Sequence, residues 1–143
     1  MHHVAIMNPK TCPVSDIVSG KKTIESRWYK NRAAPWNKIN SGDTIYFKES
    51  GKPVSAQAKV EKIIQYEDLT PEKTREIISM YGTKISPVHM KEFIDQAHDK
   101  KYCILIFLTA PKPLKPFYIK KNGFGSAAAW LVVDTISKIK KTA

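Results

Sequence analysis

The residues best suited to chemistry lie between Gly20 and Trp36, in the segment GKKTIESRWYKNRAAPW. Basic and aromatic side chains are interleaved there around a single carboxylate, that of Glu25. Cations match phosphate oxygens and aromatic faces stack on exposed bases, so this pattern is typical of a surface for unpaired nucleic acid rather than for a smooth duplex. It predicts a nucleic-acid-binding site that contains Lys21, Lys22, Glu25, Arg27, Trp28, Tyr29, Lys30, Arg32 and Trp36.

Each residue type in this segment suggests its own role. The cations are expected to hold phosphates and the aromatic rings to sandwich a base; the former are Lys22, Arg27, Lys30 and Arg32, and the latter Trp28, Tyr29 or Trp36. Three roles are open to Glu25: an ion pair with Lys22 or Arg27, an acceptor for a base amino group, or a general base. The competing interpretation is structural, because most surface charges are simply solvated and most tryptophans pack in a core.

The charge of the whole chain favours a polyanionic partner. The 143 residues carry 24 Lys and Arg against 13 Asp and Glu, which gives a formal net charge of +11. Such an excess attracts nucleic acid or an anionic membrane surface. No sustained amphipathic helix with large apolar residues accompanies the lysines, so we expect RNA or single-stranded nucleic acid as the partner and no membrane.

Other compositional features narrow the class of protein. Hydrophobic residues make up 42% of the chain, enough for one folded domain over residues 1–143. Cys12 and Cys103 are far apart and form no C-x-x-C pair, and the histidines do not cluster, so we expect no metal and no cofactor. The start of the chain has no secretion signal, which favours a cytoplasmic protein, or a nuclear one in a eukaryote.

The elements that would position these residues follow from hydrophobic periodicity and turn signals. Alternation over residues 22–27 places Lys22, Ile24 and Ser26 on one face and Glu25 and Arg27 on the other. Pro111 to Pro116 are expected to form an extended connection or an edge. Strands are predicted at residues 3–7, 22–27, 44–48, 54–66, 101–109, 117–119 and 130–133, helices at 13–19, 71–81 and 87–97, and a tight turn at 122–125. Five to seven mostly antiparallel strands with one helical insertion predict an α+β domain whose sheet is curved or closed.

Four of these residues also carry a resemblance to a known family. Gly20, Lys22, Glu25 and Arg27 reproduce the motif G-x-K-x-x-E-x-R, which resembles the hallmark of the ASCH domain family in the PUA-like superfamily. The motif follows a short predicted helix and precedes a Gly-Asp turn before a strand, as in that family. The resemblance implies a small PUA-like β-barrel flanked by short helices, with Lys22, Glu25 and Arg27 in a cleft that binds RNA or a modified nucleobase.

The same resemblance implies an alternative function. Some branches of the family are small hydrolases that remove an acyl group from cytidine-type nucleosides with the motif lysine, a threonine and a separate glutamate. Lys22 matches the lysine, whereas Glu25 stands at the threonine position, and the separate glutamate has three candidates, Glu67, Glu72 and Glu92. The leading hypothesis is therefore an RNA-binding module, and the alternative is a hydrolase of N-acylated cytidine or of RNA phosphodiesters with Lys22 and Glu25 as catalytic residues.

Overall fold

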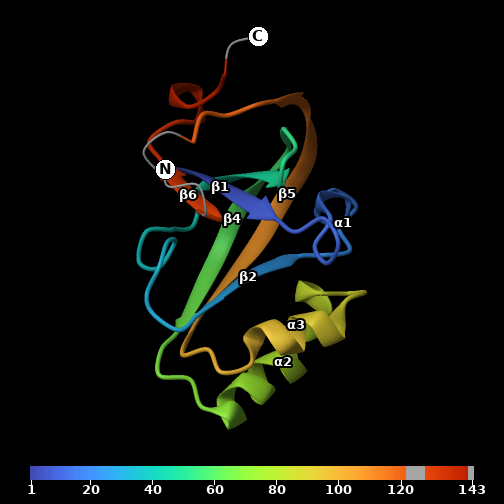
Figure 1. The fold of residues 1–143 in the computed structure, drawn as a ribbon, viewed down its shortest axis with the longest axis vertical. Coiled ribbons are helices and arrows are strands. Elements are labelled where there is room, and N and C mark those ends of the chain that lie inside the picture. The colour runs from blue at the N-terminus through green and yellow to red at the C-terminus, as the bar shows by residue number, and fades with distance from the viewer. Residues whose placement is uncertain (122–127, 142–143) are drawn as a thin grey trace.

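The computed structural model describes residues 1–121 and 128–141, and in these ranges six strands form one sheet (Figure 1). The strands run in the order β2-β5-β4-β3-β1-β6 across the sheet. The elements along the chain are β1 (His2–Met7), α1 (Val14–Val18), β2 (Ile24–Tyr29), β3 (Thr44–Glu49), β4 (Val54–Tyr66), α2 (Pro71–Ile85), α3 (Met90–Ala97), β5 (Tyr102–Phe117), β6 (Trp130–Val133) and a 3₁₀ turn, η1 (Ile136–Lys138). The predicted turn at residues 122–125 lies outside the described residues.

The sheet is mixed and strongly curled, which confirms the predicted α+β small-barrel class. Among the described strands, β1 and β3 pair in parallel, and the other neighbours pair antiparallel. The pairing of β4 with β5 shifts register at three places, and such bulges let long strands bend. The resulting half-barrel encloses a core in which Phe47, Ile45 and Ile106 are completely buried, and Ile17 of α1 packs into the same core.

A second core lies between the outer face of the sheet and the helices α2 and α3. Alternation along β2 sends Ile24 and Trp28 toward these helices, where they pack with Ile77 and Phe93. Glu25 and Arg27 point to the opposite, concave side of the same strand. The helices therefore pack against one face of β2, and Glu25 and Arg27 lie on its other face, at the mouth of the half-barrel.

Helix boundaries differ from the prediction because tertiary packing outweighs local signals. Thr70 caps α2 as expected, since its hydroxyl accepts a hydrogen bond from the Lys73 N–H at 3.1 Å. Gly82 does not end the helix, which continues to Ile85. A β-carbon at Gly82 would lie 3.0 Å from the Met90 side chain, so this glycine permits α2 and α3 to approach. The next helix begins at Met90 and not at the Ser-Pro signal before it.

The proline-rich segment belongs to a strand and not to a connection. β5 continues to Phe117, and Pro113 pairs with Ala56 of β4. The partner strand β2 covers β5 only as far as Phe107, so the prolines lie on a stretch with a neighbour on one side. Of the two predicted alternatives, the edge is therefore correct. Proline has no N–H group to donate, and on the unpaired side of an edge strand no ladder hydrogen bond is lost. None of the helices in the described ranges is long and apolar enough to cross a membrane.

Candidate functional site

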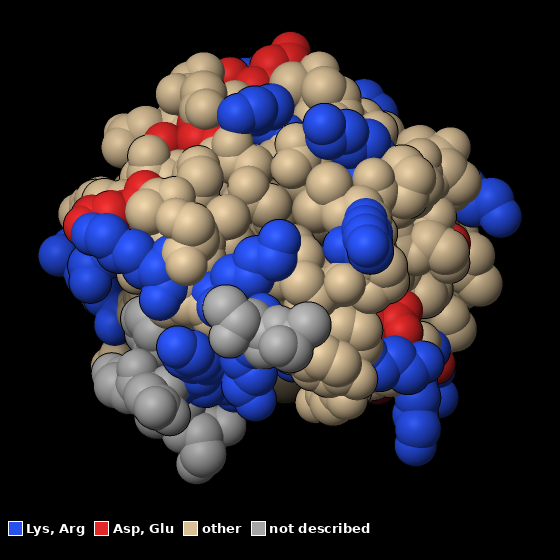
Figure 2. Space-filling model, turned by 90° about the horizontal axis from the view of Figure 1, so that it is seen from above, with Lys and Arg blue, Asp and Glu red and all other residues tan. Residues whose placement is uncertain are grey.

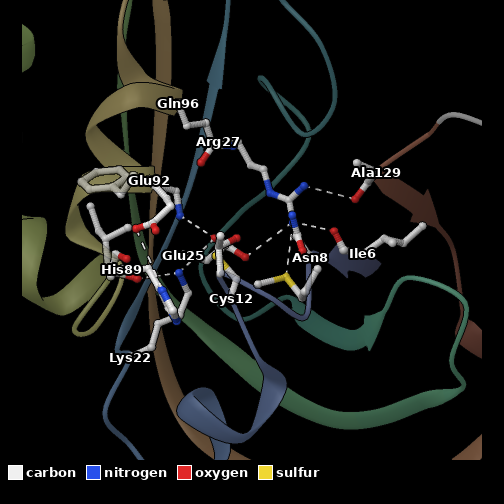
Figure 3. A pocket seen from close by; sticks show the side chains of 16 residues that line it. Ile6, Asn8, Cys12, Lys22, Glu25, Arg27, His89, Glu92, Gln96 and Ala129 are labelled. Atoms are coloured by element: carbon white, nitrogen blue, oxygen red, sulfur yellow. Dashed lines mark hydrogen bonds and ion pairs between the residues drawn. The ribbon is translucent and has the colours of Figure 1, made fainter.

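A pocket of about 420 Å³ opens at the mouth of the half-barrel, between β2, the end of β1, the loop before α1 and the helix α3 (Figure 3). This volume is in the range of small-molecule sites, about 300–1,000 Å³. The motif residues Lys22, Glu25 and Arg27 all line it. The other lining residues are Ile6, Met7, Asn8, Thr11, Cys12, Ser26, Ile85, Ser86, His89, Glu92, Phe93, Gln96 and Ala129.

The chain enters this site through a turn that needs glycine. Gly20 follows α1 with a φ of 82°, in the left-handed region that a residue with a side chain rarely adopts. The turn is held by the Lys22 N–H, which donates to the Asp16 carbonyl at 2.9 Å, and by the Thr23 N–H, which donates to the Lys84 carbonyl at 3.0 Å. The turn at Gly20 therefore directs Lys22, the next motif residue, into the pocket.

Lys22 is buried, with 3% of its surface exposed. Its ammonium donates to the carbonyl of Ile85 at 2.7 Å, at the C-terminal end of α2. Terminal helix carbonyls lack partners within the helix and carry a partial negative charge, so a cation is favoured there. β2 begins at Ile24, so Lys22 precedes the strand, and its ammonium reaches the Glu25 carboxylate although the predicted alternation placed the two residues on opposite faces.

Glu25 is the centre of the ionic cluster. One carboxylate oxygen, Oε1, accepts a hydrogen bond from the Ser26 N–H at 2.8 Å and lies 3.4 Å from the Lys22 ammonium. The other, Oε2, lies 3.5 Å from the Arg27 guanidinium. Burial alone would raise the pKa of Glu25, but the charges of Lys22 and Arg27 and the Ser26 N–H outweigh it, so the pKa lies below its usual value. Glu25 is therefore an ionised acceptor at neutral pH.

One oxygen of the Glu25 carboxylate can still accept a hydrogen bond. Glu25 is 3% exposed, and its Oε2 atom is buried without a hydrogen-bond donor in the described residues. A buried acceptor without a donor is costly, more so when it is charged. Because Glu25 lines the pocket, a ligand with an N–H group can supply the missing hydrogen bond.

Arg27 forms the wall next to β1 and β6 (Figure 3). Its guanidinium donates to the carbonyls of Ala129 at 3.2 Å and Ile6 at 3.5 Å. It also lies over the ring of Trp130, 5.0 Å from the centroid. These contacts hold the arginine in one orientation and direct one nitrogen toward Glu25.

Residues of α3 and its N-terminal end form the opposite wall, and the sequence analysis identified one of them. Glu92 lines the pocket, and the ring of His89 lies 4.0 Å from its carboxylate. The two other glutamates proposed for that role do not line it: Glu67 pairs with exposed Arg32 at 2.7 Å, and Glu72 is in the first turn of α2. His89, Phe93 and Gln96 were missed because their helical pattern is also that of an ordinary packing helix.

The aromatic residues of the segment do not form the expected sandwich at this pocket. Trp28 and Trp36 are buried in two different cores, and the Tyr29 hydroxyl donates to the Ala34 carbonyl at 2.7 Å. The structural interpretation of both tryptophans is therefore the correct one. Burial in a core gains more for an indole than partial exposure at a rim. The aromatic ring that does line the pocket is that of Phe93.

The outer cations of the segment lie away from the pocket. Lys21 and Lys30 are exposed, and Arg32 lies over the rings of Trp36 and Tyr102. These side chains belong to the outer surface and are not brought together with Lys22. In the described part of the chain, no group of three or more His, Cys, Asp or Glu residues is arranged to hold a metal ion.

Comparison with known proteins identifies the fold. No family model and no curated protein matches the sequence. Crystal structures of two ZmASCH variants from Zymomonas mobilis, a serine-to-alanine and a tyrosine-to-phenylalanine variant, superpose with TM-scores of 0.71 and 0.69. The sequences are 20% and 19% identical, over 96% of this chain in both cases and over 91% and 93% of those chains. The chain has the fold of an ASCH domain.

A third ASCH structure from the same organism agrees, with a TM-score of 0.67 and 20% identity over 92% of this chain and 87% of that chain. Within this ASCH fold, the pocket brings together three of the four motif residues, Lys22, Glu25 and Arg27, while Gly20 shapes the turn before them. Two cations surround a buried carboxylate, one oxygen of which has no hydrogen-bond donor in the described residues. The site can therefore receive a hydrogen-bond donor, but the carboxylate among the motif residues is already paired with cations.

Proposed function

We propose that this ASCH domain binds RNA or another single-stranded nucleic acid, as one domain, by taking an unpaired base into the pocket. The observation that carries the proposal is the buried Oε2 atom of the ionised Glu25, which has no donor among the described residues and belongs to a side chain that lines a pocket of suitable size. Exocyclic amino groups of cytosine, adenine and guanine are donors on base edges that unpaired nucleotides expose. In this proposal Glu25 accepts from such an amino group.

The remaining walls suit the other properties of a base. Phe93 provides an apolar surface, and Asn8 and Gln96 carry amides that both donate and accept hydrogen bonds. Lys22 and Arg27 are held by the protein itself, so they keep Glu25 ionised and oriented and leave its second oxygen for the ligand. The pocket thus offers one charged acceptor at a fixed position, which favours a base that presents an N–H donor at its edge.

The surface charge supports the nucleic-acid part of the proposal. Lys and Arg side chains gather over the face shown in Figure 2, while most Asp and Glu side chains in that view lie toward its edge. Many of the lysines near the C-terminal end are exposed, among them Lys112, Lys115, Lys120, Lys138, Lys140 and Lys141. A basic surface of this kind attracts the phosphate backbone without regard to sequence.

The test is a titration with single-stranded and duplex RNA at several salt concentrations. We expect tighter binding of the single strand, with a log–log slope of about −0.7 for each phosphate contacted. Glu25→Gln is expected to weaken binding of a cytosine-rich strand about tenfold or more, since a hydrogen bond to a charged group contributes about 1.5–3 kcal/mol. Glu61→Gln, at an exposed position of β4, is the control and is expected to bind as the wild type does. Absence of single-strand binding, or binding that salt does not change, would contradict the proposal.

A second candidate function, hydrolysis of an acyl group from a cytidine-type nucleoside or cleavage of an RNA phosphodiester, rests on Glu92. This residue lines the same pocket as Lys22 and Glu25, so an exposed carboxylate adjoins the buried ionic cluster. Incubation with N-acylated cytidine and with RNA tests it. If the function is hydrolysis, the wild type and Lys21→Ala form product and Lys22→Ala does not. No product from the wild type would exclude both reactions for these substrates.

A further inference from the structure

A second hollow adjoins the pocket on the far side of the wall that Arg27 holds. It measures about 520 Å³, and its lining includes Ser50 and Lys121. It shares Ile6, Met7, Asn8 and Ala129 with the first pocket. The carbonyls of two of these residues, Ile6 and Ala129, accept the hydrogen bonds of Arg27. The two hollows are therefore neighbours, separated by one fixed guanidinium and the ends of β1 and β6.

Lys48 of β3 lies beside this second hollow. It is the Cα partner of Ile6 in the parallel β1–β3 ladder, and Ile6 lines both hollows. The side chain is buried, with 8% of the residue exposed, and in the described ranges no hydrogen bond or ion pair reaches its ammonium. The adjacent carboxylate, that of Glu49, is occupied by Lys52 at 3.5 Å and by the Val14 N–H at 3.0 Å. Within the described ranges, Lys48 is thus a largely buried lysine whose ammonium has no protein anion.

Lys121 brings a second cation to the same place. It lines the hollow, and its ammonium donates to the carbonyl of Ala128 at 3.4 Å. Burial, together with the nearby charge of Lys121, lowers the pKa of Lys48. The like charges of Lys48 and Lys121 repel each other, and an anion between them would remove that repulsion. Lysine ammonium groups bind phosphate as compact point charges with several donors.

We propose that the second hollow is a phosphate subsite formed by Lys48 and Lys121, next to the base pocket. The inference rests on the proposed function, because the phosphate would belong to the nucleotide whose base lies beside Glu25 or to its neighbour in the strand. Because the two hollows share a wall, a nucleotide can place its base in one hollow and its phosphate in the other. The domain would then hold a defined base–phosphate unit and not only a base.

The experiment compares cytidine, its 3′- and 5′-monophosphates, and inorganic phosphate by NMR titration, which detects millimolar affinities. For the wild type we expect at least one monophosphate to bind about tenfold more tightly than cytidine, in line with one charge-assisted hydrogen bond. Lys48→Met and Lys121→Met are expected to remove most of that gain and to leave the affinity for cytidine unchanged. Lys38→Met, at an exposed position, is the control and is expected to keep the gain. Melting curves are expected to show that Lys48→Met does not lower stability, because it removes the charge of a largely buried side chain that pairs with no anion among the described residues.

The outcomes separate this inference from the proposed function. If cytidine and both monophosphates bind equally to the wild type, or if the lysine variants weaken cytidine as much as its monophosphates, the subsite is wrong and the base pocket remains. If no nucleoside binds but inorganic phosphate shifts the resonances around Lys48 and Lys121, the subsite stands and the base pocket is wrong. If neither phosphate nor any nucleotide binds there, the inference fails.

Discussion

Lys22→Met is expected to lower the free energy of unfolding by about 3 kcal/mol, because removal of one member of a buried ionic cluster leaves the charge of its partner only partly compensated. The substitution keeps the length of the side chain but leaves the Glu25 carboxylate with one cation at 3.5 Å, and it leaves the Ile85 carbonyl without its 2.7 Å donor. Urea denaturation followed by circular dichroism measures the effect.

The neighbouring lysine offers a matched control for this prediction. Lys21 is exposed, so Lys21→Met is expected to change the unfolding free energy by no more than about 0.5 kcal/mol. The double variant Lys22→Met with Glu25→Gln is expected to recover part of the loss, because the stranded charge is then removed as well. Equal effects of the two single lysine substitutions would show that Lys22 is not in the buried cluster.

Trp28→Ala is expected to lower the unfolding free energy by about 3–5 kcal/mol, the usual cost when a large aromatic side chain is removed from a core. The indole packs edge-on against Phe93, with ring centroids 5.8 Å apart, and its N–H donates to the Ser26 hydroxyl at 2.9 Å. Its loss leaves a cavity between β2 and the helices that hold it. Urea denaturation is again the measurement, and Tyr118→Ala, at a side chain 57% exposed, is the control with little expected change.

A milder substitution at the same position distinguishes a core residue from a base-stacking residue. Trp28→Phe is expected to keep the RNA affinity of the folded protein while it lowers stability by a smaller amount, since the ring no longer fills the space or reaches Ser26. A tenfold loss of RNA affinity in a fully folded Trp28→Phe protein would place the indole at the ligand and overturn its assignment to the core.

The local order of elements was predictable because periodicity and turn residues act over short distances. The alternation from Val54 to Tyr66 predicts β4 with its observed bounds, and Thr70 predicts the start of α2. Signals for the end of an element were less reliable. Gly82 is a helix stop in isolation, but the contact with Met90 makes it a packing position inside α2. Packing contributes more to helix stability than the propensity of one residue does.

The amino-acid sequence was enough to predict a basic α+β domain with a curled sheet and to locate the three charged motif residues that line the pocket. Which neighbours join them depends on the tertiary structure. Strand alternation placed Lys22 and Glu25 on opposite faces, but Lys22 precedes β2, and its ammonium lies 3.4 Å from the Glu25 carboxylate. Likewise, Trp28, which was expected to stack on a base, packs in the core, and Phe93 of α3, a member of the same core, also lines the pocket. Such assignments depend on how distant elements pack, and no spacing within one segment encodes that.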